Sequence, residues 1–479
     1  MRVAICVILS SLAIVAGRTA PVQPLASSER PYGQGSTEFA QLSSASCAAA
    51  SCHGNGRVGT TGGEHSTWAA EVFPQGAHDP HARAYRVLFN AESQRMAAEL
   101  KIPAAHESVL CLKCHAVEGV KPAGAAETAN AAEASRTVAE GVGCGACHGP
   151  AEKWLSAHHQ PGWKLLSNRD KWELYGFVPN ENLVAREMNC AKCHVGAADR
   201  EVNHDLIAAG HPRLAFEYAK NHFHPKYRRH WQESQPQPDF EVKAWMIGRA
   251  VNLRAAAELL RARAERAAVD DPKTPWPEFA HSSCYACHQT IEASPRRSAA
   301  SSPRSPGSLL WEPWHGGGIE VAARHTPSAF TGVASPELRA VRELQEAMTK
   351  RVPNPVRVRS LADAAIGELD GWLAAVQAAE DRGASRLPVG MPRQLIRDLA
   401  VDSLSGDKLR DQDWDFLASR YLGCAAMYHA SGGRAALPEL TAPLTALGDA
   451  LRFPRGVNNP AGFGREKLDI VRDQFRLMR

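Results

Sequence analysis

The sequence contains no hydrophobic segment that would hold the mature chain in a membrane. Residues 3–16 form an apolar run of 14 residues that follows the positive Arg2, and this run is shorter than the roughly 20 residues of a membrane-spanning helix. No later stretch reaches roughly 18 apolar residues. We therefore expect residues 1–20 to be a signal peptide, residues 21–45 to be a flexible leader, and the mature chain to have no stable membrane span.

The sequence also has little net charge and few familiar catalytic patterns. Its 55 Lys and Arg residues nearly balance its 51 Asp and Glu residues, which gives a formal net charge of +4. This composition gives no reason to expect a nucleic-acid partner or a membrane-surface partner. No Ser-His-Asp set, phosphate-binding loop or pair of catalytic carboxylates stands out. The cysteines and histidines are therefore the main candidates for functional residues.

Ten of the 12 cysteines lie in five short motifs that each end in a histidine. Four motifs read C-x-x-C-H, and the first, CAAASCH, has four residues between its cysteines. In such a motif two thiols add to the vinyl groups of one haem while the following histidine binds the iron from the proximal side. The attachment cysteines are Cys47, Cys52, Cys111, Cys114, Cys144, Cys147, Cys190, Cys193, Cys284 and Cys287, and the proximal histidines are His53, His115, His148, His194 and His288.

The repetition of the motif distinguishes haem attachment from other roles of cysteine pairs. An isolated zinc site or redox dithiol would explain one copy, and disulfides would not need a histidine after each pair. We expect about five haem c groups, because the small Ala and Ser residues in the first motif allow a bulged loop. Four haems, with the first motif empty, is the alternative. Because haem is attached to thiols outside the bacterial cytoplasm, the motifs and the signal peptide both predict a periplasmic protein.

A short helix after the fourth motif is predicted to connect two haems. Asn203 is a plausible N-cap, His204 and His211 follow it, and Pro212 ends the helix. Seven residues are about two helical turns, so both rings would lie on one face roughly 10 Å apart. One iron cannot bind both rings at that distance. We expect them to be distal ligands of two different irons.

The fold is predicted to be mainly α-helical, with little regular sheet. A multihaem domain at 46–293 would be packed around its porphyrins, because so many haems in so short a segment leave little apolar side chain for an ordinary core. A Ser-, Pro- and Arg-rich linker at 294–330 would lead to a C-terminal helical domain at 331–479, whose apolar residues recur at helical spacing.

The order of these motifs resembles that of the tetrahaem cytochrome c-554 family, within the wider group that includes hydroxylamine oxidoreductase and pentahaem nitrite reductase. The likeness covers about 40–290. It is carried by the first motif with Trp68 and the HARA at His81, by CLKCH, by GVGCGACHGP with a later histidine, and by CAKCH. The stretched first motif, the fifth motif, the NHDLIAAGHPRL segment and the C-terminal helices depart from the family pattern.

The resemblance implies further ligands. By position, His81 and either His158 or His159 look like the family's distal ligands. The haem attached at residues 111–115 corresponds to the family's haem with an open axial position. Against an open iron stands the supply of histidines, since 12 of the 15 outside the motifs lie between His53 and His288. Both an open and a closed iron are therefore compatible with the sequence at this motif.

Two classes of function follow. The first is an exported electron carrier that works with redox partner proteins and binds no substrate. The alternative is a haem oxidoreductase that acts on a small nitrogen or sulfur compound at one open iron, for which the family likeness alone is weak support. No residue is predicted to be catalytic.

Overall fold

The computed structural model describes residues 30–33, 39–57, 60–70, 79–117, 137–222, 238–269, 274–284, 287–288, 308–404, 414–451 and 465–479. The predicted signal peptide, most of the predicted leader, residues 294–307 of the predicted linker and an Ala-rich insertion after the second motif lie outside these residues. The rest of the predicted linker, 308–330, is described and contains two helices. So does most of a basic, aromatic segment after residue 222. In the described part of the chain no helix is long and apolar enough to cross a membrane.

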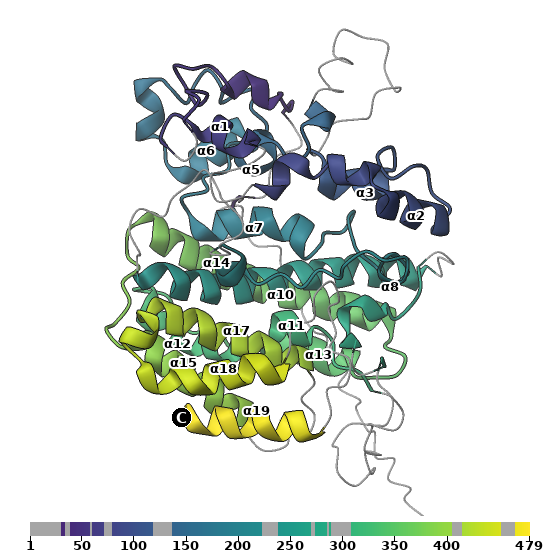
Figure 1. The fold of residues 1–479 in the computed structure, drawn as a ribbon, viewed down its shortest axis with the longest axis vertical. Coiled ribbons are helices and arrows are strands. Elements are labelled where there is room, and N and C mark those ends of the chain that lie inside the picture. Colours follow the sequence, from purple (N-terminus) through teal and green to yellow (C-terminus); the bar gives the residue numbers. More distant parts are fainter. Residues whose placement is uncertain are drawn as a thin grey trace, which may run out of the picture.

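The prediction of a mainly α-helical fold is confirmed, and the described residues contain isolated β-bridges but no strand (Figure 1). The N-terminal part consists of short helices: η2 (Ser44–Cys47), α1 (Glu64–Ala69), η3 (Pro80–Arg83), η4 (Arg86–Phe89), α2 (Ala91–Glu99), α3 (Val109–His115), α5 (Cys144–His148), η5 (Pro161–Leu165), α6 (Asn168–Tyr175), α7 (Leu183–His194), α8 (His204–Ala208), α9 (Tyr218–His222) and η6 (Phe279–His281).

Most of the remaining helices are longer, and together the remaining helices form a bundle. They are α10 (Pro238–Ala268), α11 (Pro313–Gly316), α12 (Ile319–Ala329), α13 (Arg339–Met348), α14 (Pro355–Asp381), α15 (Met391–Leu404), α17 (Trp414–Ala430), η8 (Gly433–Ala435), α18 (Pro438–Leu451) and α19 (Arg465–Leu477). Figure 1 shows α1, α2, α3, α5 and α6 at one end of the molecule, α7 below them, and the bundle beyond α7.

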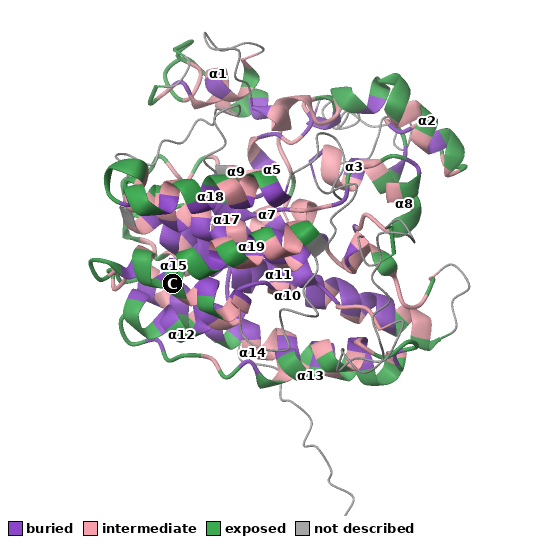
Figure 2. Ribbon diagram, turned by 60° about the horizontal axis from the view of Figure 1, so that its bottom comes forward, coloured by how far each residue is buried: buried purple, intermediate pink, exposed green. Residues whose placement is uncertain are grey.

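One apolar core runs through the bundle and continues into the N-terminal part. It includes Val184 and Met188 of α7, Trp245 of α10 and Leu369 of α14, and it extends to Phe475 of α19. Helix α10 lies at its centre and packs against α7, α9, α11, α12, α14 and α17. In the sequence, the spacing of apolar residues over 239–268 predicts an amphipathic helix with one apolar side. Most of the residues of α10 are instead buried, because neighbours cover it on several sides (Figure 2).

The region of the first three motifs has a much smaller core. Its second apolar cluster consists of Leu88, Ala97, Ala105, Leu112, Ala116 and Val138. Most side chains around it are half-buried or exposed (Figure 2). So small a cluster is far below what an ordinary domain of this size buries, as expected if porphyrins supply the missing apolar surface.

Candidate functional site

Each of the five motifs lies at or near the end of a helix. Helices α3, α5 and α7 each end at the motif histidine, at His115, His148 and His194. The first motif begins at the end of η2, and the fifth follows η6. Because cysteines three residues apart lie on one side of a helix, the helical motifs present both thiols in the same direction. All ten motif cysteines are free of disulfide bonds.

Two pairs of motifs meet through their cysteines. The thiols of Cys47 and Cys144 are hydrogen-bonded, and so are those of Cys114 and Cys193. These hydrogen bonds lower the pKa of Cys144 to about 7 and that of Cys193 to about 6. The first motif therefore lies against the third, and the second lies against the fourth.

Asparagine side chains and a buried arginine join the motifs further. Asn189 Nδ2 on α7 donates to the carbonyl oxygens of Ala146 (2.8 Å) and Cys147 (3.1 Å), which connects the fourth motif to the third. Arg200 is buried, and its Nη1 donates to the carbonyl oxygen of Lys113 at 3.1 Å, between the second and fourth motifs. The motifs thus follow the spatial order first, third, fourth, second.

The imidazole rings of four motif histidines each face one histidine from outside the motifs. The ring centroids are 6.3 Å apart for His53 and His158, 6.1 Å for His81 and His194, 6.4 Å for His115 and His211, and 6.2 Å for His204 and His288. The ring planes are 20° apart in the first and last pairs, and 87° and 88° apart in the other two.

These separations fit two imidazoles bound to opposite sides of one metal ion. A metal–imidazole bond is about 2 Å long and the ring centroid lies about 1.2 Å behind the bonded nitrogen, so the two centroids are about 6 Å apart. Stacked aromatic side chains can approach more closely, as the rings of Phe89 and His106 do at 4.2 Å. The four pairs therefore leave room for an iron and a porphyrin plane between their rings.

The second ring nitrogen of several of these histidines is already hydrogen-bonded. Nδ1 of His115 lies 2.8 Å from the carbonyl oxygen of Ala84, that of His158 lies 2.7 Å from that of Leu155, and that of His211 lies 2.7 Å from that of Pro212. Since a carbonyl oxygen only accepts, Nδ1 carries the proton and Nε2 keeps its lone pair for a metal.

At two other rings a side-chain carboxylate, instead of a backbone carbonyl oxygen, accepts the hydrogen bond from Nδ1. Asp79 Oδ1 lies 2.9 Å from Nδ1 of His81, and Glu64 Oε2 lies 3.0 Å from Nδ1 of His53. Partial burial raises the pKa of Glu64, but hydrogen bonds from His53 and the Gly62 N–H hold it below its usual value. A carboxylate on Nδ1–H makes the imidazole a stronger ligand.

Burial also keeps the rings of the second motif's pair neutral. It lowers the pKa of His115, although the hydrogen bond to Ala84 opposes this, and it lowers the pKa of His211. Only a neutral imidazole can bind a metal through Nε2.

Helix α8 is shorter than the sequence predicted, but it still separates two histidines as expected. Asn203 Oδ1 caps it by accepting from the Leu206 N–H at 3.0 Å. The helix ends at Ala208, and Gly210 then takes a φ of 119°, which glycine adopts readily. His211 therefore lies beyond the helix, so its ring faces the second motif while the ring of His204 faces the fifth.

Two further predicted ligands have other contacts within the described part of the chain. His159 is exposed, and its Nε2 lies 2.9 Å from Nε2 of Gln160. His148 of the third motif stacks on Phe177 at 6.0 Å, and its Nδ1 lies 3.3 Å from the Asn180 side-chain amide. In the sequence, Asp79 directly precedes Pro80 and His81 and is predicted only to cap a helix. The sequence does not single out Glu64, Ala84 or Arg200. Asp79 alone carries a signal, because a capping acid two residues before a histidine can also reach its ring.

Comparison with known proteins agrees with the first part of this arrangement. Residues 48–149 match the family model of cytochrome c554 and c-prime. No curated protein and no solved structure matches the chain. The match covers the first motif from its second residue onward, together with the second and third motifs. Over these residues the chain thus resembles a family of multihaem c-type cytochromes.

Proposed function

We propose that the protein is an exported, periplasmic electron carrier with five covalently bound haems, and that two histidines close the irons at His53, His115, His194 and His288. Their distal ligands are His158, His211, His81 and His204, respectively. When bound, each haem supplies a one-electron couple between ferric and ferrous iron. The chain's own residues hold the rings in place and keep small molecules from these irons.

The observation that carries this proposal is the set of four ring separations between 6.1 and 6.4 Å. Each pair joins one motif histidine to one histidine outside the motifs, as a proximal and a distal ligand would. Chance contacts among histidines would also bring together two motif histidines. We assign no second ligand to the iron at His148.

The contacts between motifs support a path for electrons that differs from the order of the sequence. Cys47 lies against Cys144, Asn189 connects the third and fourth motifs, and Cys114 lies against Cys193. Helix α8 then contacts η6, which precedes the fifth motif. Electrons would pass through the first, third, fourth, second and fifth motifs, or in reverse, and leave to a redox partner protein at either end.

The proposed closure of the His115 iron separates a carrier from an enzyme. The family resemblance implied an open position here, but the ring of His211 lies 6.4 Å from that of His115. An iron with imidazoles on both sides has no place for a nitrogen or sulfur substrate. Turnover of hydroxylamine, nitrite or sulfite at this iron would favour the oxidoreductase instead.

Electron paramagnetic resonance of the ferric holoprotein tests the proposal. We expect the His115 iron to be low-spin and unchanged by cyanide or nitric oxide. The near-parallel and near-perpendicular ring pairs should also give two classes of low-spin signal. A high-spin signal from this iron that shifts when cyanide is added would contradict the carrier and revive the oxidoreductase.

The number of haems and the export need their own measurements. Mass spectrometry of protein from the periplasmic fraction should show five haems and loss of about the first 20 residues. Cys52→Ala should release the haem of the first motif, whereas Cys424→Ser, at a buried cysteine outside the motifs, should retain all five. A wild-type protein with four haems would show that the first motif is empty.

A further inference from the structure

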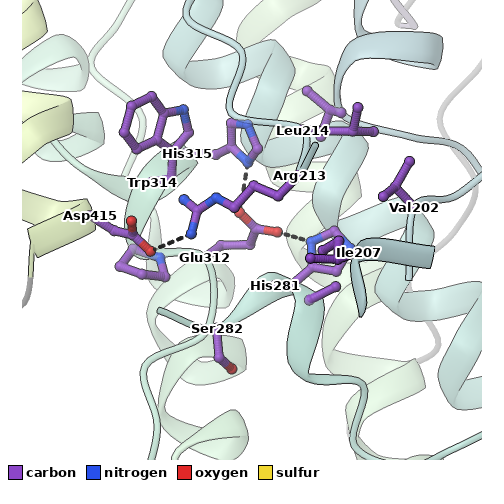
Figure 3. A pocket seen from close by; sticks show the side chains of 13 residues that line it. Val202, Ile207, Arg213, Leu214, His281, Ser282, Glu312, Trp314, His315 and Asp415 are labelled. Carbon is purple, nitrogen blue, oxygen red and sulfur yellow. Dashed lines mark hydrogen bonds and ion pairs between the residues drawn. The ribbon is translucent and has the colours of Figure 1, made fainter. Parts of the chain in front are cut away.

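A buried carboxylate joins two imidazoles beside the fifth motif (Figure 3). One oxygen of Glu312 accepts from Nδ1 of His281, and the other accepts from Nδ1 of His315 at 2.6 Å. Glu312 and His315 are each only 3% exposed. Because the carboxylate can only accept, each ring carries its proton on Nδ1, and Nε2 of each neutral ring has a lone pair.

The lone pair on Nε2 of His315 is buried and has no hydrogen-bond partner among the described residues. A buried polar atom without a partner is costly and calls for an explanation. His315 also lines a cavity of about 20 Å³, which has room for one water molecule. Nε2 is thus placed to take up a proton that water delivers.

The cluster is close to the attachment point of the fifth haem. His281 precedes Cys284 by three residues, and its carbonyl oxygen accepts from the Glu312 N–H at 2.8 Å. Arg213, another residue of the cavity wall, lies 3.3 Å from Cys284 Sγ through its Nη1. Since Cys284 would carry one thioether of the haem, the charge of this haem would act on the cluster at short range.

Burial and the neighbouring charges have opposite effects on the pKa of His315. Burial lowers its pKa and Arg249 of α10 adds to this, whereas Glu312 raises it. Among the described residues, other charged groups also lie around the cluster. Arg213 is paired with Asp415 of α17 at 2.8 Å, and Glu217 is paired with Arg249 at 3.5 Å. Glu187 of α7 lies near Arg249, and Glu278 lies before η6. Burial raises the pKa of Glu312, but the hydrogen bonds that both histidines donate hold it below its usual value, so it stays ionised.

The backbone adds a second sign that the position of Glu312 is required by its surroundings. Its φ is 50°, in the left-handed region that a residue with a side chain rarely adopts. Such strain persists where the surrounding structure requires it, often at functional sites. The side chain of His281 keeps 12% exposure, whereas that of His315 has 4%, so His281 gives the cluster its route to solvent.

We propose that His281, Glu312 and His315 form a proton-binding site that is coupled to the fifth haem. Nε2 of His315 takes up one proton from solvent when the iron at His288 gains one electron from its neighbour in the haem series, and it releases the proton when the electron leaves. One N–H bond forms, and the iron changes from ferric to ferrous. The added proton offsets the added negative charge, so the net charge of the region is unchanged. This proposal rests on the proposed function, because it requires a haem at the fifth motif.

A redox titration of the holoprotein at several pH values tests the site. In the wild type, one haem component should fall in potential by about 59 mV per pH unit, the shift of a one-proton, one-electron step. His315→Asn keeps an N–H for Glu312 but removes Nε2, and should abolish this slope. His325→Asn is the matched control, because His325 is also buried beside a carboxylate, with Nε2 2.6 Å from Asp398, but lies in α12. It should keep the slope.

Proton uptake gives a second readout that does not depend on the folding of the His315 variant. Reduction of the wild type in weakly buffered solution with a pH indicator should consume close to one proton more than reduction of Glu312→Gln near neutral pH. Equal uptake in both proteins, or an unchanged slope in His315→Asn, would overturn the site. A holoprotein that lacks the fifth haem by mass would instead overturn the proposed function.

Discussion

The imidazole ring of His81 lies 6.1 Å from that of His194, with the ring planes 87° apart. His81 belongs to η3, before the second motif, whereas His194 ends the fourth motif. The other three pairs also join residues from separate segments of the chain. The proposed ligands are therefore interleaved, and none of these four haems would belong to one continuous stretch of sequence.

The neighbouring residues His158 and His159 provide a direct test of this pairing. His158 faces His53 at 6.3 Å, whereas His159 is exposed. We expect His158→Ala to convert the His53 iron from low spin to high spin and to let it bind cyanide. The adjacent His159→Ala should leave the spin state of every iron as it is in the wild type. Electron paramagnetic resonance of the two ferric proteins measures both outcomes, and identical spectra would refute the assignment of His158.

His204 and His211 are predicted to act on different irons. His204→Ala should open the iron at His288, and His211→Ala should open the iron at His115. Because the two sites are distinct, the double variant should show twice the high-spin signal of either single variant. If the double variant gave no more high-spin iron than one single variant, both histidines would serve the same site or one would serve none.

Asp79 is predicted to lower the potential of the iron at His194. The buried Asp79 carboxylate accepts a hydrogen bond from Nδ1 of His81, with Oδ1 and Nδ1 2.9 Å apart. Its negative charge stabilises ferric iron through the ring. Asp79→Asn should raise this potential by roughly 60–130 mV, from the 1.5–3 kcal/mol of a hydrogen bond to a charged group. Asn still caps η3.

Asp170→Asn is the control for this change. Asp170 belongs to the capping box of α6, where its carboxylate accepts hydrogen bonds from the hydroxyl and the N–H of Ser167 rather than from a histidine. The substitution should leave all potentials in place. A spectroscopic redox titration resolves the two variants, and an equal shift in both would mean that helix capping, not the ring contact, sets the potential.

Glu380 is predicted to make the fold less stable as pH rises. Burial raises its pKa to about 7, although Lys243 opposes this, and its carboxylate accepts from the Leu183 N–H at the start of α7. In the unfolded chain the pKa of this glutamate is about 4.3. Between about pH 4.3 and pH 7 Glu380 is therefore protonated in the folded protein but ionised in the unfolded chain. The stabilisation is complete below about pH 4.3 and is lost as pH rises through 7, up to about 3 kcal/mol.

Glu380→Gln should remove this dependence, because glutamine keeps an acceptor but does not ionise. Denaturant unfolding followed by circular dichroism should show the wild type losing stability from pH 5 to pH 8 relative to this variant. Glu439→Gln, at a 48% exposed side chain paired with Arg393, should follow the wild type. Parallel pH curves for wild type and Glu380→Gln would exclude Glu380 as the cause.

The sequence led to more specific predictions about haem attachment than about the contacts between motifs. Spacing alone identified the motif cysteines, and the cap at Asn203 with seven residues between His204 and His211 predicted separate irons. The partner of His115 could not be predicted, because its ring pair with His211 depends on tertiary packing. Asp79 was expected only as a helix cap, since a cap is a local feature whereas a ring contact depends on the chain's path.

The C-terminal helices show the same limit. Periodicity predicted the helices after residue 331, but the apolar core continues from α19 through α14 and α10 into α7, whose last residues form the fourth motif. The boundary at 331 stays a prediction. Expression of 331–479 alone would expose the face of α14 that α10 covers, so circular dichroism of that fragment would show whether the helices need α10.

The pairing of His53 with His158 has a consequence for the order in which the protein is made. During synthesis and the proposed export, the first motif would emerge long before the segment that supplies its proposed second ligand. In that interval an iron at His53 would meet nearer histidines first, such as His65 and His81. Bonds to the wrong imidazole must then break before His158 can bind. We therefore expect the exchange of wrong ligands to be the slow step in maturation. A protein that attaches haem and keeps the chain extended until the segment after the third motif has emerged would avoid these intermediates.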